Sequence, residues 1–416
     1  MKKIMSWLSE VFAPKMEKVS KNIWVQSLQT SIVQTMPLIF VGSLATVFYV
    51  VKIYLKWFPD FSVVNNYTFG LMALIISFML PYNVMEKKGY NKMKIVALFA
   101  GLGLYLLVLK PQVVKDGSVF NTALFGAQGM FIALITGFFT AIIMGLFANF
   151  TFFKKDTTIP DFIVAWFDSI IPVTIVIATG WILAYVVGID IVNVILNVFK
   201  PIMAFAQTYF GFVLLATFGA LVYSMGISPW VVFAFLSPIQ YQAIAANAAN
   251  VSAGKAPEFI NTFEVMHSGW VCIGGTGSTF ALVVFMAFLA KSAKFKAVGK
   301  ASLVPSIMNI NEPAVFGSIA WNPLLMIPMV LSAFFTSLVT YFALSTGLAN
   351  IPAEVMQLWY LPFPISTWLM TQDVRGLILM VVCVAITCII YYPFFKVADG
   401  VELKNEQNRV GEKTEW

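Results

Sequence analysis

Long apolar stretches recur along this chain and leave it few ways to fold. Each approaches the roughly 20 residues that an α-helix needs to cross a bilayer, and short polar connections separate them. A segment in lipid must satisfy its backbone polar groups internally, so only helices and closed barrels can span a membrane. We therefore predict an all-α polytopic membrane protein with about ten transmembrane helices, near residues 28–55, 69–85, 95–109, 130–150, 162–187, 208–225, 230–248, 270–290, 322–346 and 376–395.

The composition agrees with a membrane protein and argues against a nucleic-acid partner. Of the 416 residues, 60% are hydrophobic and 11% are charged, and the mean hydropathy is +0.85. The net charge of +7 comes from lysines that cluster in short loops, as the positive-inside rule expects. Cys272, Cys383 and Cys388 lie in apolar runs without metal-site spacing, so we expect small core residues and neither a metal nor a cofactor. Lys2-Lys3 is followed by a mixed run, so no cleavable signal peptide is expected.

The lysine distribution predicts how the chain is organised. We expect a cytoplasmic amphipathic segment at 1–27, an N-terminal transmembrane half at 28–190, a C-terminal transmembrane half at 191–396 and a flexible cytoplasmic tail at 397–416. With the N-terminus inside, alternate crossings put both termini and the basic loops in the cytoplasm. Those loops are residues 86–94, 152–160 and 291–300.

The sequence Asn309-Ile310-Asn311-Glu312-Pro313 places polar residues between apolar segments. An acid at bilayer depth costs about 2.5–3.5 kcal/mol on the insertion scale, so it is expected to face water, a ligand or a partner. Pro313 interrupts a helix, and broken backbone at membrane depth is tolerated where it lines a cavity. The connectivity predicts a re-entrant hairpin at 301–321 and a second segment, 347–374, that dips in from outside.

Two other interpretations of this motif stay open. Glu312 could be a buried carboxylate paired to a lysine for helix packing. A channel could also use a re-entrant loop, although the sequence shows no ring-forming acid cluster and no filter-like repeat.

Lys291 to Pro323, KSAKFKAVGKASLVPSIMNINEPAVFGSIAWNP, resembles the IIC sugar-permease component of the bacterial phosphoenolpyruvate-dependent phosphotransferase system, in its lactose/cellobiose (diacetylchitobiose) family. Further similarity lies in Thr35 to Ile39 with Gly42-Ser43, in Gly274 to Thr279 and in Trp359 to Pro364, and covers essentially the whole chain. The resemblance implies the glucose-superfamily IIC fold, with ten transmembrane helices plus re-entrant hairpins.

The resemblance also implies a homodimer in the bacterial plasma membrane. The N-terminal half would form the dimer interface and the C-terminal half would bind the sugar. The sugar, a disaccharide of the cellobiose, chitobiose or lactose kind, would cross by alternating access and be phosphorylated by the phosphocysteine of a separate IIB protein, which depends in turn on IIA. Whether this chain is itself an enzyme stays open, because the phosphoryl donor lies on IIB.

The family's key carboxylate falls on Glu312. A carboxylate in a desolvated site accepts strong hydrogen bonds from sugar hydroxyls and can assist deprotonation of the hydroxyl that attacks phosphorus. Asn309 and Asn311 can each donate and accept hydrogen bonds, which matches vicinal hydroxyls. The family's sugar-contacting histidine is replaced by Ser228, and its Arg-Asp pair by Gln29 and Thr30. The sugar and the coupling to phosphoryl transfer are therefore left open.

The remaining candidate site residues each allow two interpretations. His267, the only histidine, could supply the missing ring, but the sequence favours a loop or interfacial histidine without a ligand. Trp359 could stack on a sugar or lie at the membrane interface. Thr279 ends a glycine-rich run that permits close approach of either a ligand or a neighbouring helix. Asp373 and Arg375 are expected to form an ion pair at a helix end.

Three functions compete at this point. The first is a phosphotransferase-system disaccharide permease. The second is an ordinary secondary transporter in which Glu312 carries a proton. The third is a sugar sensor that binds IIB-like partners without transport. The chemical form of the accumulated sugar separates the first two, and binding without uptake identifies the third.

Overall fold

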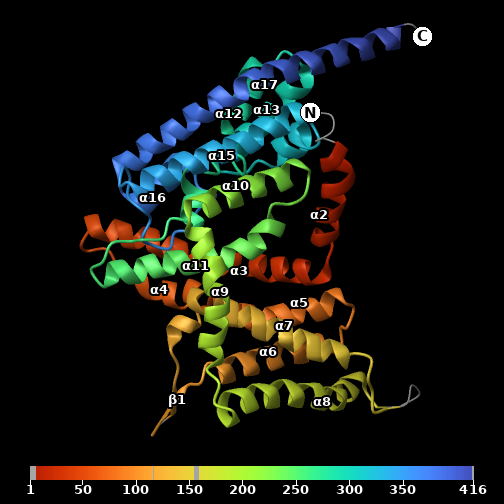
Figure 1. The fold of residues 1–416 in the computed structure, drawn as a ribbon, viewed down its shortest axis with the longest axis vertical. Coiled ribbons are helices and arrows are strands. Elements are labelled where there is room, and N and C mark those ends of the chain that lie inside the picture. Colours follow the sequence, from red (N-terminus) through yellow and green to blue (C-terminus); the bar gives the residue numbers. More distant parts are fainter. Residues whose placement is uncertain (1–5, 116, 154–158, 415–416) are drawn as a thin grey trace. The chain divides into compact units, whose positions relative to one another are not determined.

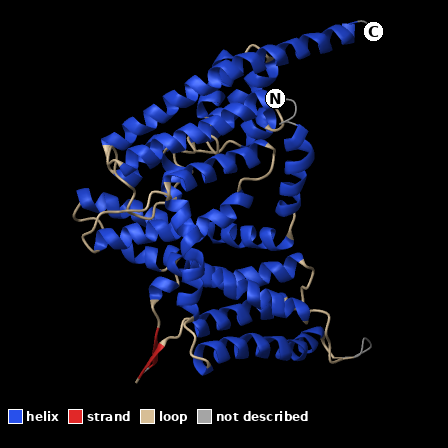
Figure 2. Cartoon of the chain, in the orientation of Figure 1, coloured by secondary structure: helices blue, strands red, loops and turns tan. Residues whose placement is uncertain are grey.

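The computed structural model describes residues 6–115, 117–153 and 159–414. The described chain is built mainly of α-helices (Figure 1, Figure 2). It forms two compact units, Lys21–Met203 (the N-terminal unit) and Met1–Ser20 with Ala204–Trp416 (the C-terminal unit). The dimer-interface and sugar-binding roles expected of the two halves stay predictions.

The number of apolar helices agrees with the sequence prediction. Among the described residues, seven helices are long and apolar enough to cross a membrane, or up to eight if one bent pair counts as a single span. Two shorter apolar helices, Lys94–Val108 and Phe280–Leu289, complete the set. The sequence predicted about ten apolar helices, and this set agrees with that number. The prediction of an all-α membrane fold is therefore confirmed.

The first transmembrane helix of the N-terminal unit begins earlier than predicted, at residue 23 rather than near residue 28. Helix α3 starts at Ile23 because the Asn22 side chain caps it, accepting a hydrogen bond from the Trp24 N–H at 2.9 Å. A buried polar link then ties α5 to α3, since Asn83 Nδ2 donates to Ser31 Oγ at 2.9 Å. The unit contains α3 (Ile23–Tyr54), α4 (Ser62–Asn66), α5 (Met72–Lys87), α6 (Lys94–Val108), the hairpin β1 (Gln112–Val114) and β2 (Gly117–Val119), α7 (Met130–Leu146), α8 (Asp161–Trp181), the π-helix η5 (Ile182–Val186) and most of α9 (Ile191–Gln207).

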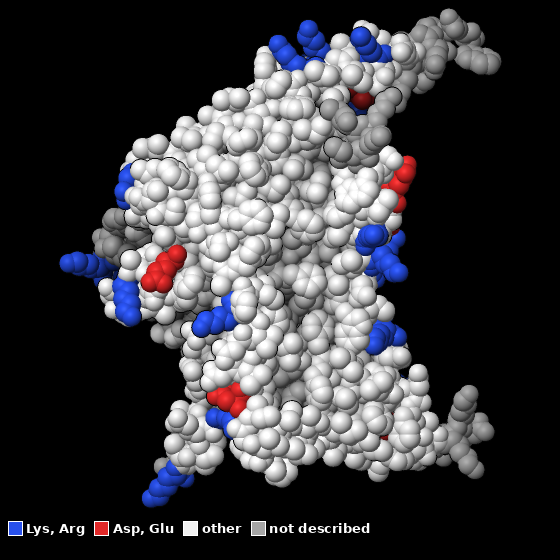
Figure 3. All heavy atoms as spheres, viewed as in Figure 1, with Lys and Arg blue, Asp and Glu red and all other residues white. Residues whose placement is uncertain are grey.

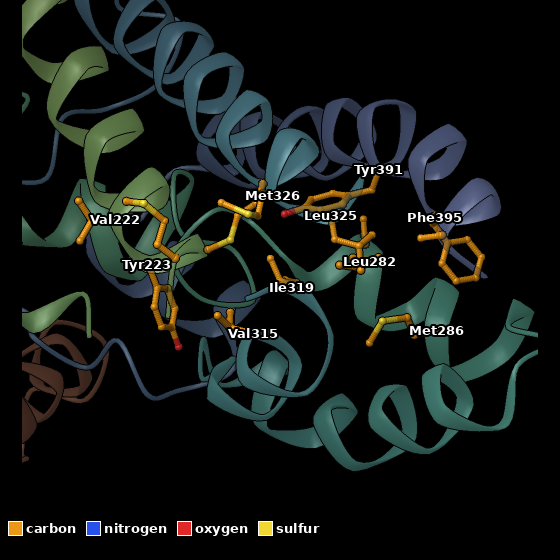
Figure 4. Packing of buried hydrophobic residues seen from close by; sticks show 14 of the residues in the cluster. Val222, Tyr223, Leu282, Met286, Val315, Ile319, Leu325, Met326, Tyr391 and Phe395 are labelled. Atoms are coloured by element: carbon orange, nitrogen blue, oxygen red, sulfur yellow. The ribbon is translucent and has the colours of Figure 1, made fainter. Parts of the chain in front are cut away.

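The C-terminal unit packs its helices around one buried apolar cluster (Figure 4). Val315 and Ile319 of the π-helix η7 (Val315–Ile319) lie among side chains from several longer helices. The segment that follows Glu312 is therefore anchored in the core. The unit contains α2 (Ala13–Ser20), α10 (Tyr209–Ser224), α11 (Trp230–Ser252), the π-helix η6 (Glu264–Gly269), α12 (Phe280–Leu289), α13 (Ala293–Ile307), α14 (Glu312–Ala314), η7, α15 (Pro323–Ser345), α16 (Phe363–Thr371) and α17 (Val374–Thr414).

The predicted span at 270–290 is wrong in its first half. Residues 270–279 form turns, and the helix begins only at Phe280. Gly274, Gly275 and Gly277 have φ angles of +78°, +101° and +86°, which a right-handed helix cannot contain. Hydropathy alone does not register this constraint, because glycine is neutral on such scales.

The predicted basic loop at 291–300 and flexible tail at 397–416 are also corrected. Residues 291–300 are helical from Ala293, and α17 continues to Thr414. The Asp399 carboxylate accepts hydrogen bonds from the N–H groups of Lys291 at 2.8 Å and Ser292 at 3.0 Å. Glu406 accepts from the N–H groups of Ala293 and Lys294, both at 2.9 Å. Two carboxylates of α17 thus cap α13, which holds the end of α17 in place.

Candidate functional site

The Asn-Glu-Pro motif forms the bend of a helical hairpin. Helix α13 ends at Ile307, Asn309 adopts a left-handed backbone with φ +57°, and α14 begins at Glu312. The Ile310 N–H closes the turn onto the Pro305 carbonyl at 2.9 Å. The chain therefore reverses where the sequence predicts a hairpin, and its depth in a membrane stays a prediction.

The bend lies against a cavity of about 50 Å³, which we call the hairpin cavity. It brings together five of the seven predicted site residues: Asn309, Asn311, Glu312, His267 and Trp359. The complete lining consists of Pro229, Trp230, Phe233, Phe263, His267, Cys272, Gly275, Thr276, Asn309, Asn311, Glu312 and Trp359. Ser228 and Thr279 lie beside the lining rather than in it, since Ser228 precedes Pro229 and Thr279 contacts Asn311.

Asn309 connects three separate stretches of the cavity wall. Its Nδ2 donates to the carbonyls of His267 at 3.3 Å and Trp359 at 3.0 Å. Its Oδ1 accepts from the Gly274 N–H at 2.9 Å. Both amide protons are already donated to the backbone. Asn309 therefore offers a ligand only its oxygen.

Asn311 fixes the glycine-rich turn in the same way. Its Nδ2 donates to the Thr276 carbonyl and to Thr279 Oγ1, both at 2.9 Å. Thr279 Oγ1 in turn donates to the Gly274 carbonyl at 2.7 Å. A Cβ at Gly275 would lie 2.5 Å from Asn311 Oδ1, so only glycine fits at this approach. The glycine run was expected to permit close approach of either a ligand or a neighbouring helix. At Gly275 the close neighbour is Asn311, which is itself a residue of the candidate site.

The polar groups left free in the cavity belong to other residues. His267 Nε2 and Trp359 Nε1 are buried and have no hydrogen-bond partner within the described part of the chain. Glu312 is exposed at the edge of the cavity, and none of the ion pairs among the described residues includes it. The prediction that Glu312 lies in a desolvated site is therefore wrong for this structure. The alternative that Glu312 pairs with a lysine has no support among the described residues.

His267 is a buried residue, so the loop or interfacial position that the sequence favoured is wrong. It lies in η6 and is 7% exposed. Its ring centroid is 4.4 Å from that of Phe233 and 4.3 Å from that of Phe263. The two aromatic rings fix the imidazole in the cavity wall. Trp230, Phe233 and Phe263 also line the cavity, and the sequence did not predict this. Aromatic residues are common in apolar helices, so no sequence pattern marks those that face a cavity.

Glu264 is a buried acid that the sequence analysis also missed. It is fully buried in η6, and its Oε1 accepts hydrogen bonds from the Met356 N–H at 3.0 Å and from Gln357 Nε2 at 3.4 Å. Its Oε2 has no partner within the described residues. A single acid in the apolar stretch before His267 was the available signal. Among the described residues, no group of three His, Cys, Asp or Glu side chains could hold a metal ion.

A multi-pass helical protein whose broken hairpin presents a carboxylate at a cavity belongs to the class of membrane transporters. The family model for the phosphotransferase system, EIIC, matches residues 29–333, so the chain belongs to this family. This assignment favours a phosphotransferase permease over the proton-coupled transporter that the sequence left open.

The similar proteins extend along nearly the whole chain. The lichenan permease IIC component of Bacillus subtilis (strain 168) is 29% identical over 98% of this chain and 96% of its own length. The cellobiose-specific EIIC component of Geobacillus stearothermophilus is 29% identical over 98% and 97%. The crystal structure of the transporter ChbC, the IIC component from the N,N'-diacetylchitobiose-specific phosphotransferase system, matches with a TM-score of 0.85 and 27% identity, over 96% of this chain and 99% of that one.

Proposed function

We propose that this chain carries a β-linked or similar disaccharide across the plasma membrane and presents it for phosphorylation by a separate IIB protein. The similar proteins are named for lichenan, cellobiose and diacetylchitobiose, which supports a substrate of linked sugar units. The sugar is released on the cytoplasmic side as its phosphate ester.

The observation that carries the proposal is the set of three polar groups at the hairpin cavity that have no partner among the described residues. The Trp359 indole N–H can only donate a hydrogen bond, the Glu312 carboxyl oxygens supply acceptors, and His267 Nε2 does either according to its tautomer. Sugar hydroxyls donate and accept, so they complement this set. The oxygens of Asn309 and Asn311 add acceptors, and the Phe233 and Phe263 rings add apolar surface for the sugar's C–H groups.

Glu312 is the residue we assign to the chemical step. As the sugar oxygen forms its bond to phosphorus, the phosphorus–sulfur bond of the IIB phosphocysteine breaks, and Glu312 accepts the hydroxyl proton. Its exposed position at the cavity edge leaves room for a donor protein to approach.

The cavity must widen before it can hold a disaccharide. Ligand sites for small molecules generally measure about 300–1,000 Å³, and the hairpin cavity measures about 50 Å³. We infer that the rest of the wall moves away from the three stretches that Asn309 ties together when sugar enters, as alternating access requires.

The partners and orientation belong to the same proposal. Exposed lysines Lys291, Lys294, Lys296 and Lys300 gather where α13 begins, and Figure 3 shows Lys and Arg side chains at this end of the C-terminal unit. This distribution supports a cytoplasmic position for that end and for both termini. We propose IIB, and indirectly IIA, as partners, and a homodimer formed through the N-terminal half.

The test is uptake of radiolabelled cellobiose, lactose and N,N'-diacetylchitobiose by bacteria that express the chain together with candidate IIA and IIB proteins. Hosts with and without the general phosphotransfer proteins are compared, and the intracellular label is separated by chromatography. We expect phosphorylated sugar in the competent host alone. Free sugar in both hosts would instead establish a proton-coupled transporter, and binding without uptake would establish a sensor.

The matched variant is Glu312→Gln, which removes the charge and keeps the shape. We expect it to reach the membrane folded and to lose uptake by a factor of about 100 or more, as for loss of a general base. Glu258→Gln makes the same change at an exposed side chain outside the cavity and should retain uptake. Parent-like uptake by Glu312→Gln would remove Glu312 from the mechanism.

A further inference from the structure

A second cavity lies in the C-terminal unit, and it is much larger than the hairpin cavity. It measures about 470 Å³ and is lined by Pro257, Leu344, Gly347, Ala349, Asn350, Ile351, Ala353, Glu354, Leu369, Met370, Thr371 and Gln372. We call it the Glu354 cavity. Its size falls within the range of small-molecule sites, about 300–1,000 Å³, so it can hold a disaccharide without widening.

The Glu354 cavity lies at the opposite end of α17 from the lysine-rich end. Gln372 of its lining lies two residues before the start of α17, whereas Asp399 caps α13 some 25 residues beyond that start, a distance of about 37 Å at 1.5 Å per residue. Figure 1 shows α16 at the start of α17 and α13 beside its later part. If the lysine-rich end is cytoplasmic, as proposed, the Glu354 cavity faces the outside.

The rim of this cavity is a fixed polar structure. Arg375 forms the expected ion pair with Asp373 at 3.1 Å and donates to the Gly347 carbonyl at 3.1 Å and to Asn350 Oδ1 at 3.0 Å. Burial opposes ionisation of Asp373, but hydrogen bonds from the Arg375 side chain and from the N–H groups of Arg375 and Asn350 outweigh it and hold the pKa of the carboxyl below its ordinary value. Gln372 adopts a left-handed backbone with φ +47°, a costly conformation for a residue other than glycine.

Glu354 is the charged side chain among the residues that line this cavity. Within the described residues it has neither a hydrogen-bond partner nor an ion-pair partner. Burial raises the pKa of its carboxyl, because the charged form loses hydration there. Hydroxyl donors from a ligand would restore those hydrogen bonds. Leu344, Ile351 and Leu369 supply apolar surface beside it, so the lining suits a ligand with both hydroxyl and C–H faces.

One short segment links the two cavities. Asn350 and Glu354 line the Glu354 cavity, and Trp359, five residues further on, lines the hairpin cavity. Met370 also lines the Glu354 cavity, and its Cε packs directly against Gly269 of η6, the π-helix that carries His267. The segment from Glu354 to Trp359 therefore borders both cavities, and η6, which lines the hairpin cavity through His267, packs against Met370 of the Glu354 cavity.

We propose that the Glu354 cavity is a first binding subsite, where the disaccharide is held before it passes into the hairpin cavity. The proposal rests on the proposed function and on the orientation given with it. Glu354 accepts hydrogen bonds from the sugar hydroxyls, and the bound sugar lies against the segment that also carries Trp359.

The experiment labels a cysteine at the cavity rim in intact cells. Gln372→Cys is introduced into the full chain together with Glu312→Gln, so that uptake through the hairpin cavity is blocked. A membrane-impermeant maleimide then measures the labelling rate with and without millimolar cellobiose, lactose or N,N'-diacetylchitobiose. Leu348→Cys, exposed on the same loop but outside the lining, is the control, and cells with the three native cysteines alone give the background.

We expect at least one sugar to slow labelling of Gln372→Cys by roughly tenfold when it saturates the site, while Leu348→Cys is unaffected. Adding Glu354→Gln should abolish the protection, whereas Glu258→Gln should preserve it. In the chain with intact Glu312, Glu354→Gln should raise the KM of uptake roughly tenfold, as for one lost charged hydrogen bond, with little change in kcat.

The outcomes separate this inference from the proposed function. Uptake of phosphorylated sugar by the parent, without protection of Gln372→Cys by any of the three sugars, overturns the subsite and leaves the proposed function standing. Absence of labelling from outside overturns it as well, because the cavity must face that side. Absence of both uptake and protection overturns the subsite together with the function on which it rests.

Discussion

The backbone N–H of Met356 donates to Glu264 Oε1 across 3.0 Å. The carboxylate is fully buried and belongs to the same π-helix as His267, whereas Met356 belongs to the segment that carries Trp359. This bond fastens together the two segments that place the imidazole and the indole at the hairpin cavity. Glu264 is therefore a positioning residue, which acts through the groups that it holds.

Glu264→Ala should lower both stability and uptake, because it leaves a buried N–H without an acceptor at a cost of about 1–3 kcal/mol. Glu264→Gln retains an oxygen at Oε1 and should remain close to the parent. Thermal midpoints of the detergent-solubilised protein and cellobiose uptake measure the two effects. If Gln proves as damaging as Ala, the charge or the proton of Glu264 is itself required, and a purely positioning role is excluded.

Gly275→Ala should abolish uptake, because the new Cβ would lie 2.5 Å from Asn311 Oδ1 at a backbone φ of +101°. Gly254→Ala is the matched control, since Gly254 also has a positive φ, +72°, but nothing lies within 4 Å of its added Cβ. The control should lose only the cost of backbone strain, about 1–2 kcal/mol. Equal effects of the two substitutions on uptake would show that the contact with Asn311 is unimportant.

Asp399→Ala should destabilise the protein, because the N–H groups of Lys291 and Ser292 lose their acceptor. Hydrogen bonds to a charged group contribute about 1.5–3 kcal/mol, so a clear fall in the thermal midpoint is expected. Glu402→Gln removes only the 3.7 Å ion pair with Lys294 and should change the midpoint little. A parent-like midpoint for Asp399→Ala would mean that the end of α17 does not stabilise α13.

Ser228→His should change which disaccharides are taken up. Position 228 immediately precedes Pro229, which lines the hairpin cavity, so a larger ring there is expected to reach the sugar. Ser228→Ala is the control and should keep the parent's profile. Uptake across a broad sugar panel decides the matter, and an unchanged profile for the histidine variant would place position 228 away from the substrate.

Apolar periodicity predicted most helices to within a few residues, because helices in lipid are selected mainly by length and hydropathy. Hydropathy failed to predict the structure where backbone φ angles are incompatible with a helix. The left-handed glycines at 274, 275 and 277 interrupt a stretch that hydropathy reads as a span. The prediction of a flexible tail at 397–416 was wrong for a different reason. Asp399 and Glu406 of α17 are hydrogen-bonded to the start of α13, and no local sequence pattern reveals such a tertiary contact.

The candidate site was predicted at the level of the motif, and less well at the level of individual roles. The rarity of acids in apolar surroundings drew attention to Glu312, and the same reasoning applied further upstream would have found Glu264. The use of the Asn309 and Asn311 amide protons by the backbone could not be anticipated. Their acceptors are carbonyl groups that come close only after the chain has folded.

The three hydrogen bonds of Asn309 reach stretches of chain that are more than 30 residues away from it along the sequence. Segments tied at one point cannot drift independently, so the three wall stretches that Asn309 joins move as a single piece. The protein would then change the side to which its substrate is exposed by carrying this piece from one position to another, with the recognition geometry unchanged on the way. The same protein atoms would then bind the sugar on both sides of the membrane.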